Sequence, residues 1–191
     1  TGNRVEVTAD GAGSEVDLSG LSGEWGTGNP YSRSKLSARA GGTLLIPNVT
    51  GLTNVALQLT GATATPLAQL RSIRQGSLSV DTITPDFSGL TNVDGSDLYA
   101  IGGATLNLNN VKAVVELRSV GADRGASVLL TNMTSLVVTN WGTYLSAGYP
   151  NGGGGLVDLS RVTNLVVCPY QPLTVRASTG GRVKLQGVES I

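Results

Sequence analysis

The chain contains no histidine and only one cysteine, Cys168. Without histidine it cannot build a Ser-His-Asp or Cys-His catalytic centre, and most catalytic zinc sites are excluded for the same reason. Cys168 has no partner for an internal disulfide and no histidine to activate it, so we expect a small, partly buried residue rather than a nucleophile. Three large classes of enzyme are therefore excluded by composition.

Charged residues are also scarce, at 14% of the 191 residues, and thirteen basic residues balance thirteen acidic ones. No run of Lys or Arg appears, so the sequence predicts neither nucleic acid nor an anionic membrane as a partner, since both require a basic surface. No apolar run approaches the ~18 to 20 residues of a membrane span, so the sequence predicts neither a membrane span nor a signal peptide within these residues. No composition shift marks a linker, so we expect one domain, residues 1–191, and its abrupt start and end predict that it is excised from a larger multidomain protein.

What the chain does have is a repeated pattern, most clearly over residues 35–52. Two alternating apolar pairs, Leu36-x-Ala38 and Leu44-x-Ile46, are separated by Gly41-Gly42 and followed by a Pro47-Asn48 corner. Alternation with period two indicates short strands, and the Gly and Asn residues indicate tight corners. The 27 Gly of the chain, roughly twice the ordinary share, suit strands joined by such corners.

Seven copies of an alternating pair followed by one apolar residue after a corner recur at intervals of 22 to 34 residues. A short unit with variable insertions is typical of a solenoid, in which successive turns bury a shared core. We therefore predict a parallel β-solenoid of about seven turns, with the right-handed sense expected of parallel crossovers. An antiparallel sandwich is the alternative. The seven sets are Val16, Leu18 and Leu21; Leu44, Ile46 and Val49; Leu78, Val80 and Ile83; Leu106, Leu108 and Val111; Val128, Leu130 and Met133; Val157, Leu159 and Val162; and Val183, Leu185 and Val188.

The residue before the third apolar position is Gly or Asn in five of the seven copies. These residue types tolerate a left-handed backbone, so the pattern predicts positive φ at this corner in most turns. Asn side chains stacked at this corner are also expected to form hydrogen bonds along the helix axis. The seven occupants are Gly20, Asn48, Thr82, Asn110, Asn132, Arg161 and Gly187.

With this corner the repeat resembles the right-handed parallel β-helix domains, which implies three short strands in each turn. Among these domains it resembles the β-helical xylan-binding modules of secreted bacterial polysaccharide-degrading enzymes. The resemblance extends over most of the chain. It implies a polysaccharide partner, with xylan as the first candidate, a secreted or cell-surface location, and covalently linked catalytic or surface domains.

Six of the eight aromatic residues lie in three insertions, at residues 22–34, 140–152 and 168–172. Flat rings in polar loops present rigid apolar area to a sugar, and neighbouring Asn, Ser and Asp can bond its hydroxyls. The alternative is that the rings are loop anchors that pack onto the scaffold. The predicted carbohydrate-binding residues are Trp25, Tyr31, Trp141, Tyr144, Tyr149 and Tyr170.

A metal site is a further hypothesis. Residues 92–97, Asn-Val-Asp-Gly-Ser-Asp, gather oxygen donors around a glycine, so calcium could bind at Asp94 and Asp97, although no cofactor is required. An Asx-rich turn is the alternative.

These features leave three functions open. The first is a non-catalytic carbohydrate-binding module for a plant cell-wall polysaccharide, and the second is a structural spacer or adhesin segment of a bacterial surface protein. The third is an enzyme resembling pectate lyases or polygalacturonases, for which carboxylates within roughly 10 Å of each other are needed. The candidate pairs are Asp81 with Asp86 and Asp94 with Asp97.

Overall fold

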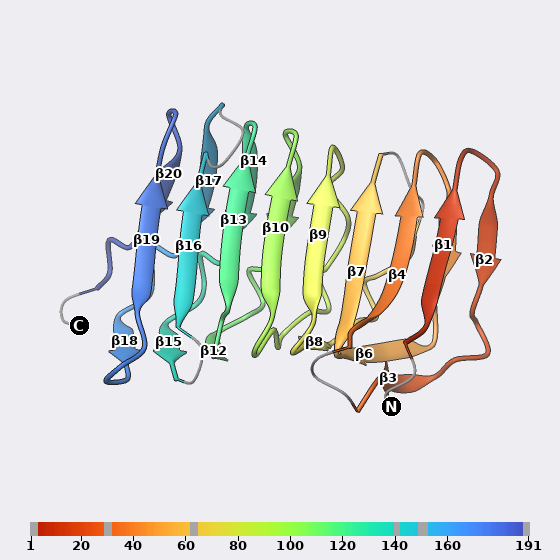
Figure 1. Ribbon diagram of the computed structural model, residues 1–191, viewed down its shortest axis with the longest axis horizontal. Helices are drawn as coiled ribbons and strands as arrows, with labels where there is room; N and C mark the ends of the chain where they lie inside the picture. Colours follow the sequence, from red (N-terminus) through yellow and green to blue (C-terminus); the bar gives the residue numbers. More distant parts are fainter. Residues whose placement is uncertain (1–3, 29–31, 62–64, 140–141, 149–152, 189–191) are drawn as a thin grey trace.

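The computed structural model describes residues 4–28, 32–61, 65–139, 142–148 and 153–188. Within these residues there are twenty short strands and no helix, and the strands wind into a parallel β-solenoid of about seven turns. In Figure 1 the front strands run upward and the chain returns behind them while it advances from the N-terminal end at the right to the C-terminal end at the left. That sense is right-handed, as predicted.

The front of Figure 1 is one continuous parallel sheet of eight strands, which we call the long sheet. Its strands pair in sequence order, so every neighbour is one turn further along the chain. Inward residues form an apolar column in which Leu36, Leu57, Leu78 and Leu98 are fully buried. The strands are β1 (Glu6–Asp10), β4 (Ser34–Arg39), β7 (Val55–Thr60), β9 (Ser77–Asp81), β10 (Asp97–Ile101), β13 (Ser119–Asp123), β16 (Thr143–Ala147) and β19 (Leu173–Ala177).

The second side of the solenoid is divided into a two-stranded and a four-stranded sheet. The third side is divided into two three-stranded sheets, which an isolated bridge between Ser72 and Asn92 links. The second-side strands are β2 (Glu15–Asp17) with β5 (Thr43–Leu45), and β11 (Thr105–Asn107), β14 (Ala126–Leu129), β17 (Gly155–Asp158) and β20 (Arg182–Lys184). The third-side strands are β3 (Gly23–Gly26), β6 (Val49–Thr53) and β8 (Ser72–Arg74), and β12 (Ala113–Val115), β15 (Ser135–Val138) and β18 (Asn164–Val167).

Two prolines explain the gap on the second side. Pro66 and Pro85 lie in the two turns without a second-side strand, and proline has no N–H to donate to a parallel ladder. The hydroxyl of the preceding threonine replaces a backbone acceptor in each case. Thr65 Oγ1 accepts a hydrogen bond from Leu44 N (3.3 Å), and Thr84 Oγ1 accepts one from Thr105 N (3.2 Å).

The predicted positions are wrong for one of the seven copies. Leu78 and Val80 belong to β9 of the long sheet, where they pair with β7 and β10, and not to the second side. In the two turns without a second-side strand, which lie between Leu44 and Leu106, the second side is formed instead by Leu67 and Phe87, and the repeat pattern does not predict the corners that follow them. The 62 residues between Leu44 and Leu106 therefore contain three turns of about equal length instead of two long ones.

The corner that follows the second side has one geometry in all eight of its occurrences among the described residues. The amide of the apolar residue after the corner donates to the carbonyl three residues earlier, at 2.9–3.3 Å. The pairs are Leu21 to Leu18, Val49 to Ile46, Leu70 to Leu67, Leu90 to Phe87, Val111 to Leu108, Met133 to Leu130, Val162 to Leu159, and Val188 to Leu185.

The prediction of positive φ at this corner is also wrong. None of its Gly or Asn occupants has a positive φ; Thr82 does, but it follows the long sheet. A four-residue β-turn of type I, closed by this hydrogen bond, needs no left-handed residue there. Left-handed residues instead follow seven successive long-sheet strands, at Gly11, Ala40, Gly61, Thr82, Gly102, Arg124 and Gly148.

The Asn side chains of the corner do bond along the axis, as expected. Asn48 Nδ2 donates to Ser19 O of the preceding turn (2.8 Å), and Asn132 Nδ2 donates to Asn109 O (3.0 Å). Asn110 Nδ2 donates to Ser88 O in the same way. The Asn residues are therefore explained by axial bonds between turns rather than by backbone conformation.

Candidate functional site

The structure describes three of the six aromatic residues predicted to bind sugar; Tyr31, Trp141 and Tyr149 lie outside the described residues. Trp25 lies in β3, opposite Leu52 of β6, and is partly buried against the core. This placement favours the loop-anchor alternative for Trp25, and its role in sugar binding stays a prediction.

The other two described rings are placed differently. Tyr144 lies in β16 of the long sheet, at an outward-facing position between Ser119 and Thr174 of the neighbouring strands. Tyr170 follows β18, has a φ of 77° and is fully exposed. Of these rings, only Tyr144 belongs to the long sheet.

The central row of outward residues on the long sheet carries mostly hydroxyl and amide side chains. Because strand residues alternate and all eight strands are in register, outward residues form straight rows across the sheet. Some of them bond across the strands, as Thr8 Oγ1 does with Ser37 Oγ (2.7 Å). The central row is Thr8, Ser37, Gln58, Ser79, Tyr99, Gly121, Ser146 and Arg176.

Tyr99 is the residue that sequence reasoning missed. A Cβ on Gly121 of the next strand would lie 2.8 Å from Cδ1 and 3.1 Å from Cε1 of Tyr99, so the ring passes directly over this glycine. Tyr99 Oη donates to Ser119 Oγ (2.8 Å), which holds the ring across β13. The ring therefore rests on the sheet instead of standing out from it, and 36% of the residue remains exposed. A glycine one turn after an outward aromatic residue is the sequence signal that could have identified it.

Next to this ring, the lower edge of the long sheet is hollowed, with a volume of about 640 Å³. The floor includes Ala56, whose short side chain faces outward between Lys35 of β4 and Ser77 of β9. Four cationic residues and one acidic residue line the hollow. The lining residues are Arg4, Ser32, Arg33, Lys35, Ala56, Gln58, Asp97 and Arg118.

Arg33 is held rigidly at this edge. Its Nη1 lies 2.7 Å from Oδ2 of Asp97, and its Nε donates to the carbonyl of Gln75 (3.1 Å). Both side chains of the ion pair are largely buried, at 23% and 19% exposed. Arg33 directly precedes β4, so its side chain connects the start of β4 with β10, three strands away in the long sheet.

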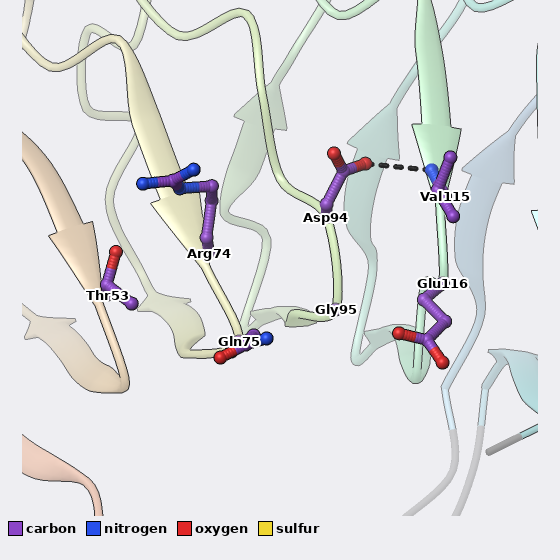
Figure 2. Close-up of a pocket in the computed structure, with 7 residues that line it drawn as sticks. All are labelled: Thr53, Arg74, Gln75, Asp94, Gly95, Val115 and Glu116. Atoms are coloured by element: carbon purple, nitrogen blue, oxygen red, sulfur yellow. Dashed lines mark hydrogen bonds between the residues drawn. The ribbon is translucent and has the colours of Figure 1, made fainter. Parts of the chain in front are cut away.

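A second, smaller pocket of about 380 Å³ lies at the corner between the third side and the long sheet (Figure 2). Gly95 widens it, because the left-handed residues of the adjacent turns, Gln75 and Glu116, carry side chains where Gly95 has none. In Figure 2 Arg74 lies on one side of the pocket and Asp94 and Glu116 lie on the other, and the Arg74 guanidinium points away from both acids. Arg74 is already engaged, since its Nη2 lies 2.5 Å from Glu24 Oε1.

The two carboxylates of the calcium hypothesis have separate partners. Asp94 Oδ1 accepts a hydrogen bond from Val115 N (2.8 Å), Asp94 Oδ2 accepts one from Asn92 Nδ2 (3.0 Å), and Asp94 N donates to Asn92 Oδ1 (2.9 Å). Asp97 pairs with Arg33 on the long sheet. In the part of the chain that the structure describes, no group of three or more His, Cys, Asp or Glu residues could hold a metal ion. These contacts favour the Asx turn, and calcium stays an untested hypothesis.

The candidate catalytic acids also have structural roles. Ser88, through its N–H and its hydroxyl, donates to the Asp86 carboxylate and lowers its pKa. A glycosidase general acid needs the opposite shift, because it must keep its proton near neutral pH. Asp81 ends β9, and a Cβ on Gly102 of the next turn would lie 2.6 Å from its Oδ1.

Comparison with protein-family models, with curated proteins and with solved structures finds no match to this chain. Among the described residues no helix is long and apolar enough to cross a membrane.

Proposed function

We propose that the chain is a non-catalytic polysaccharide-binding domain that holds an extended sugar chain across the outer face of the long sheet. The observation that carries this proposal is Tyr99, whose ring rests over Gly121 with its outer surface open to solvent. An aromatic ring fixed in this way presents apolar area to one face of a pyranose at little entropic cost.

The surroundings of the ring support the same function. Ser79 and Ser146 lie in its row, and Tyr144 lies two strands away in the adjacent row. Strands repeat about every 4.8 Å, close to the length of one sugar residue in an extended polysaccharide, so hydroxyl-bearing side chains recur at the spacing of the ligand. Direct and water-mediated hydrogen bonds to sugar hydroxyls can then form at successive positions.

The aromatic loops remain part of the proposal. In the sequence, Trp141 and Tyr149 stand on either side of β16, which carries Tyr144. We place the domain in a secreted or cell-surface protein, joined to catalytic or surface domains, with xylan as the first candidate ligand.

The test is affinity electrophoresis of the protein in gels containing xylan, glucans, mannans or pectin, followed by calorimetry on the best polymer. Tyr99→Ala should weaken binding by about five- to 150-fold, which corresponds to ~1 to 3 kcal/mol for burial of a large apolar side chain. Gly121→Ala keeps the tyrosine but forces its ring off the sheet, so it should weaken binding as well.

Tyr170→Ala removes an exposed tyrosine that lies outside the long sheet, so it tests the third predicted loop separately from the sheet. Trp141→Ala and Tyr149→Ala test the loops separately. Unchanged affinity of Tyr99→Ala beside a loss in Trp141→Ala would move the site to the loops. Reducing ends released from the polymer would replace the binding domain with an enzyme, and retention by no polymer would favour the spacer or adhesin function.

A further inference from the structure

The cationic hollow at the lower edge of the long sheet has no role in the binding described so far. We propose that it binds the anionic groups of an acidic polysaccharide, carboxylates or sulfate esters, so that the ligand of this domain is a polyanion. This inference rests on the proposed function and names the class of its ligand.

Charged residues are unevenly distributed over the molecule. The whole chain has a formal net charge of zero, yet Arg4, Arg33, Lys35 and Arg118 line one hollow with Asp97 as its acidic residue. One more carboxylate stands beside it, since Glu6 lies 3.1 Å from Arg4 and 3.8 Å from Lys35. Four cationic side chains and two acidic ones therefore meet at this edge of the sheet.

The hollow is elongated across the strands of the long sheet. The hollow extends from Lys35 of β4, across β7 and β9, to Asp97 of β10 and Arg118 just before β13. Four strand intervals correspond to about 19 Å, which is long enough for several sugar residues and too long for a single small anion. Gln58 of the hollow lies in the same row as Tyr99, two strands away, so one extended chain can reach both.

The Arg33 side chain is pre-organised at the edge of the hollow. Arg33 is fixed by Asp97 and by the carbonyl of Gln75, so its remaining donors are held in place before a ligand arrives. A guanidinium presents donors in a planar fork that matches carboxylate and sulfate oxygens. Nucleic acid fits less well, because a strand of bases requires a larger positive charge and repeated stacking rings.

The experiment compares matched ligands. Polygalacturonate is compared with its methyl ester, which has the same backbone without the charge, and dextran sulfate is compared with dextran. We expect the charged member of at least one pair to bind more tightly, and the difference to shrink as salt rises from about 0.05 to about 0.5 M. The pair that responds identifies the anion as a carboxylate or a sulfate ester.

Two variants on one strand provide the matched test. Lys35 and Arg39 both lie on β4, face outward and pair with an acid of β1, but only Lys35 lines the hollow. Lys35→Gln should weaken binding of the charged polymer about two- to fivefold, the effect of one partly exposed charge, while Arg39→Gln should not. Lys35→Arg should restore binding, and melting curves verify that each variant is folded.

Each other outcome overturns the inference. Equal affinity for charged and neutral polymers, with Lys35→Gln unchanged and Tyr99→Ala weakened, would refute the anionic ligand and leave the proposed function standing. An equal effect of Arg39→Gln would show that the hollow is not the site. Tighter binding of a single-stranded DNA oligonucleotide than of any polysaccharide would assign the hollow to nucleic acid, and absence of binding to every polymer would refute both proposals.

Discussion

Replacing Leu130 by alanine tests the packing of the solenoid most directly. Leu130 is fully buried, and its corner is repeated directly before and after it by those of Leu108 and Leu159, so its neighbours along the axis are also leucines. Removing three carbon groups loses about 2 to 3 kcal/mol of transfer free energy at ~0.8 kcal/mol each. The cavity adds to this loss, because ladders hold the adjacent turns in place and limit collapse. We expect a total of about 3 to 5 kcal/mol, the upper part of the range for buried leucines.

The same substitution at Leu185 is the matched control. Leu185 occupies the equivalent corner two turns later, but it is only partly buried in this chain. Less apolar area is lost, and a terminal turn can fray without unfolding the remainder. Leu185→Ala should therefore lower the free energy of unfolding by less than about half as much as Leu130→Ala.

The assay is urea denaturation followed by circular dichroism, with hydrogen exchange to detect turns that open separately. Because solenoids can depart from two-state unfolding, the slopes of the transitions must be compared before free energies are calculated. A Leu130→Ala midpoint equal to that of the parent would mean that the leucine does not lie in the core. An effect of Leu185→Ala as large as that of Leu130→Ala would contradict the distinction between inner and terminal turns.

Three more predictions concern ionisation, backbone conformation and metal. Burial raises the pKa of Asp158, but hydrogen bonds from Lys184 and Ser160 outweigh it and hold the pKa below its ordinary value. The stability that results is present above the ordinary pKa and is lost as the pH falls through the lowered pKa. Asp158→Asn should therefore reduce the loss of melting temperature below about pH 4 in an acid titration. Ala40 has a φ of 52°, so Ala40→Gly should remove about 1 to 2 kcal/mol of strain, offset in part by the entropy of glycine, and urea titration should show a gain below about 1 kcal/mol; a clear loss would refute the strain. Calcium should leave the melting temperature unchanged, and an increase that Asp94→Asn abolishes would instead establish the calcium site.

The fold class could be predicted because a parallel solenoid imposes the same local conditions on each turn. Alternating apolar pairs and corner residues recur wherever a strand must face the core, and six of the seven predicted copies lie on the second side of the solenoid. The prediction failed at Leu78-x-Val80, because an alternating pair looks the same on every side. Pro66 and Pro85 lie in the two turns in which the second-side strand is absent. The alternating apolar pair that predicts such a strand is therefore absent from these turns as well.

The corner residues show a second limit of the sequence. Asn tolerates positive φ, but it also carries an amide that can reach a carbonyl of the preceding turn, and sequence alone does not distinguish these uses. At Asn48 and Asn132 the axial hydrogen bond is the explanation, while the left-handed positions after the long sheet are occupied by residues as different as Ala40 and Arg124.

The candidate site was least predictable, because it depends on residues one turn apart. Tyr99 becomes a flat platform only because Gly121 follows 22 residues later in the adjacent strand, and Lys35 borders a hollow only because Ala56 occupies the next one. Intervals between turns vary from 20 to 30 residues in the long sheet, so no fixed spacing reveals these neighbours. Balanced overall charge concealed the cationic hollow for the same reason: the balance is a sum over the chain, whereas a ligand meets only the charges that the register brings to one face. In a solenoid, the register between turns therefore determines which side chains meet on one face. Tyr99→Ala tests the proposed aromatic platform on the long sheet, and Lys35→Gln tests the proposed anion site on the same sheet.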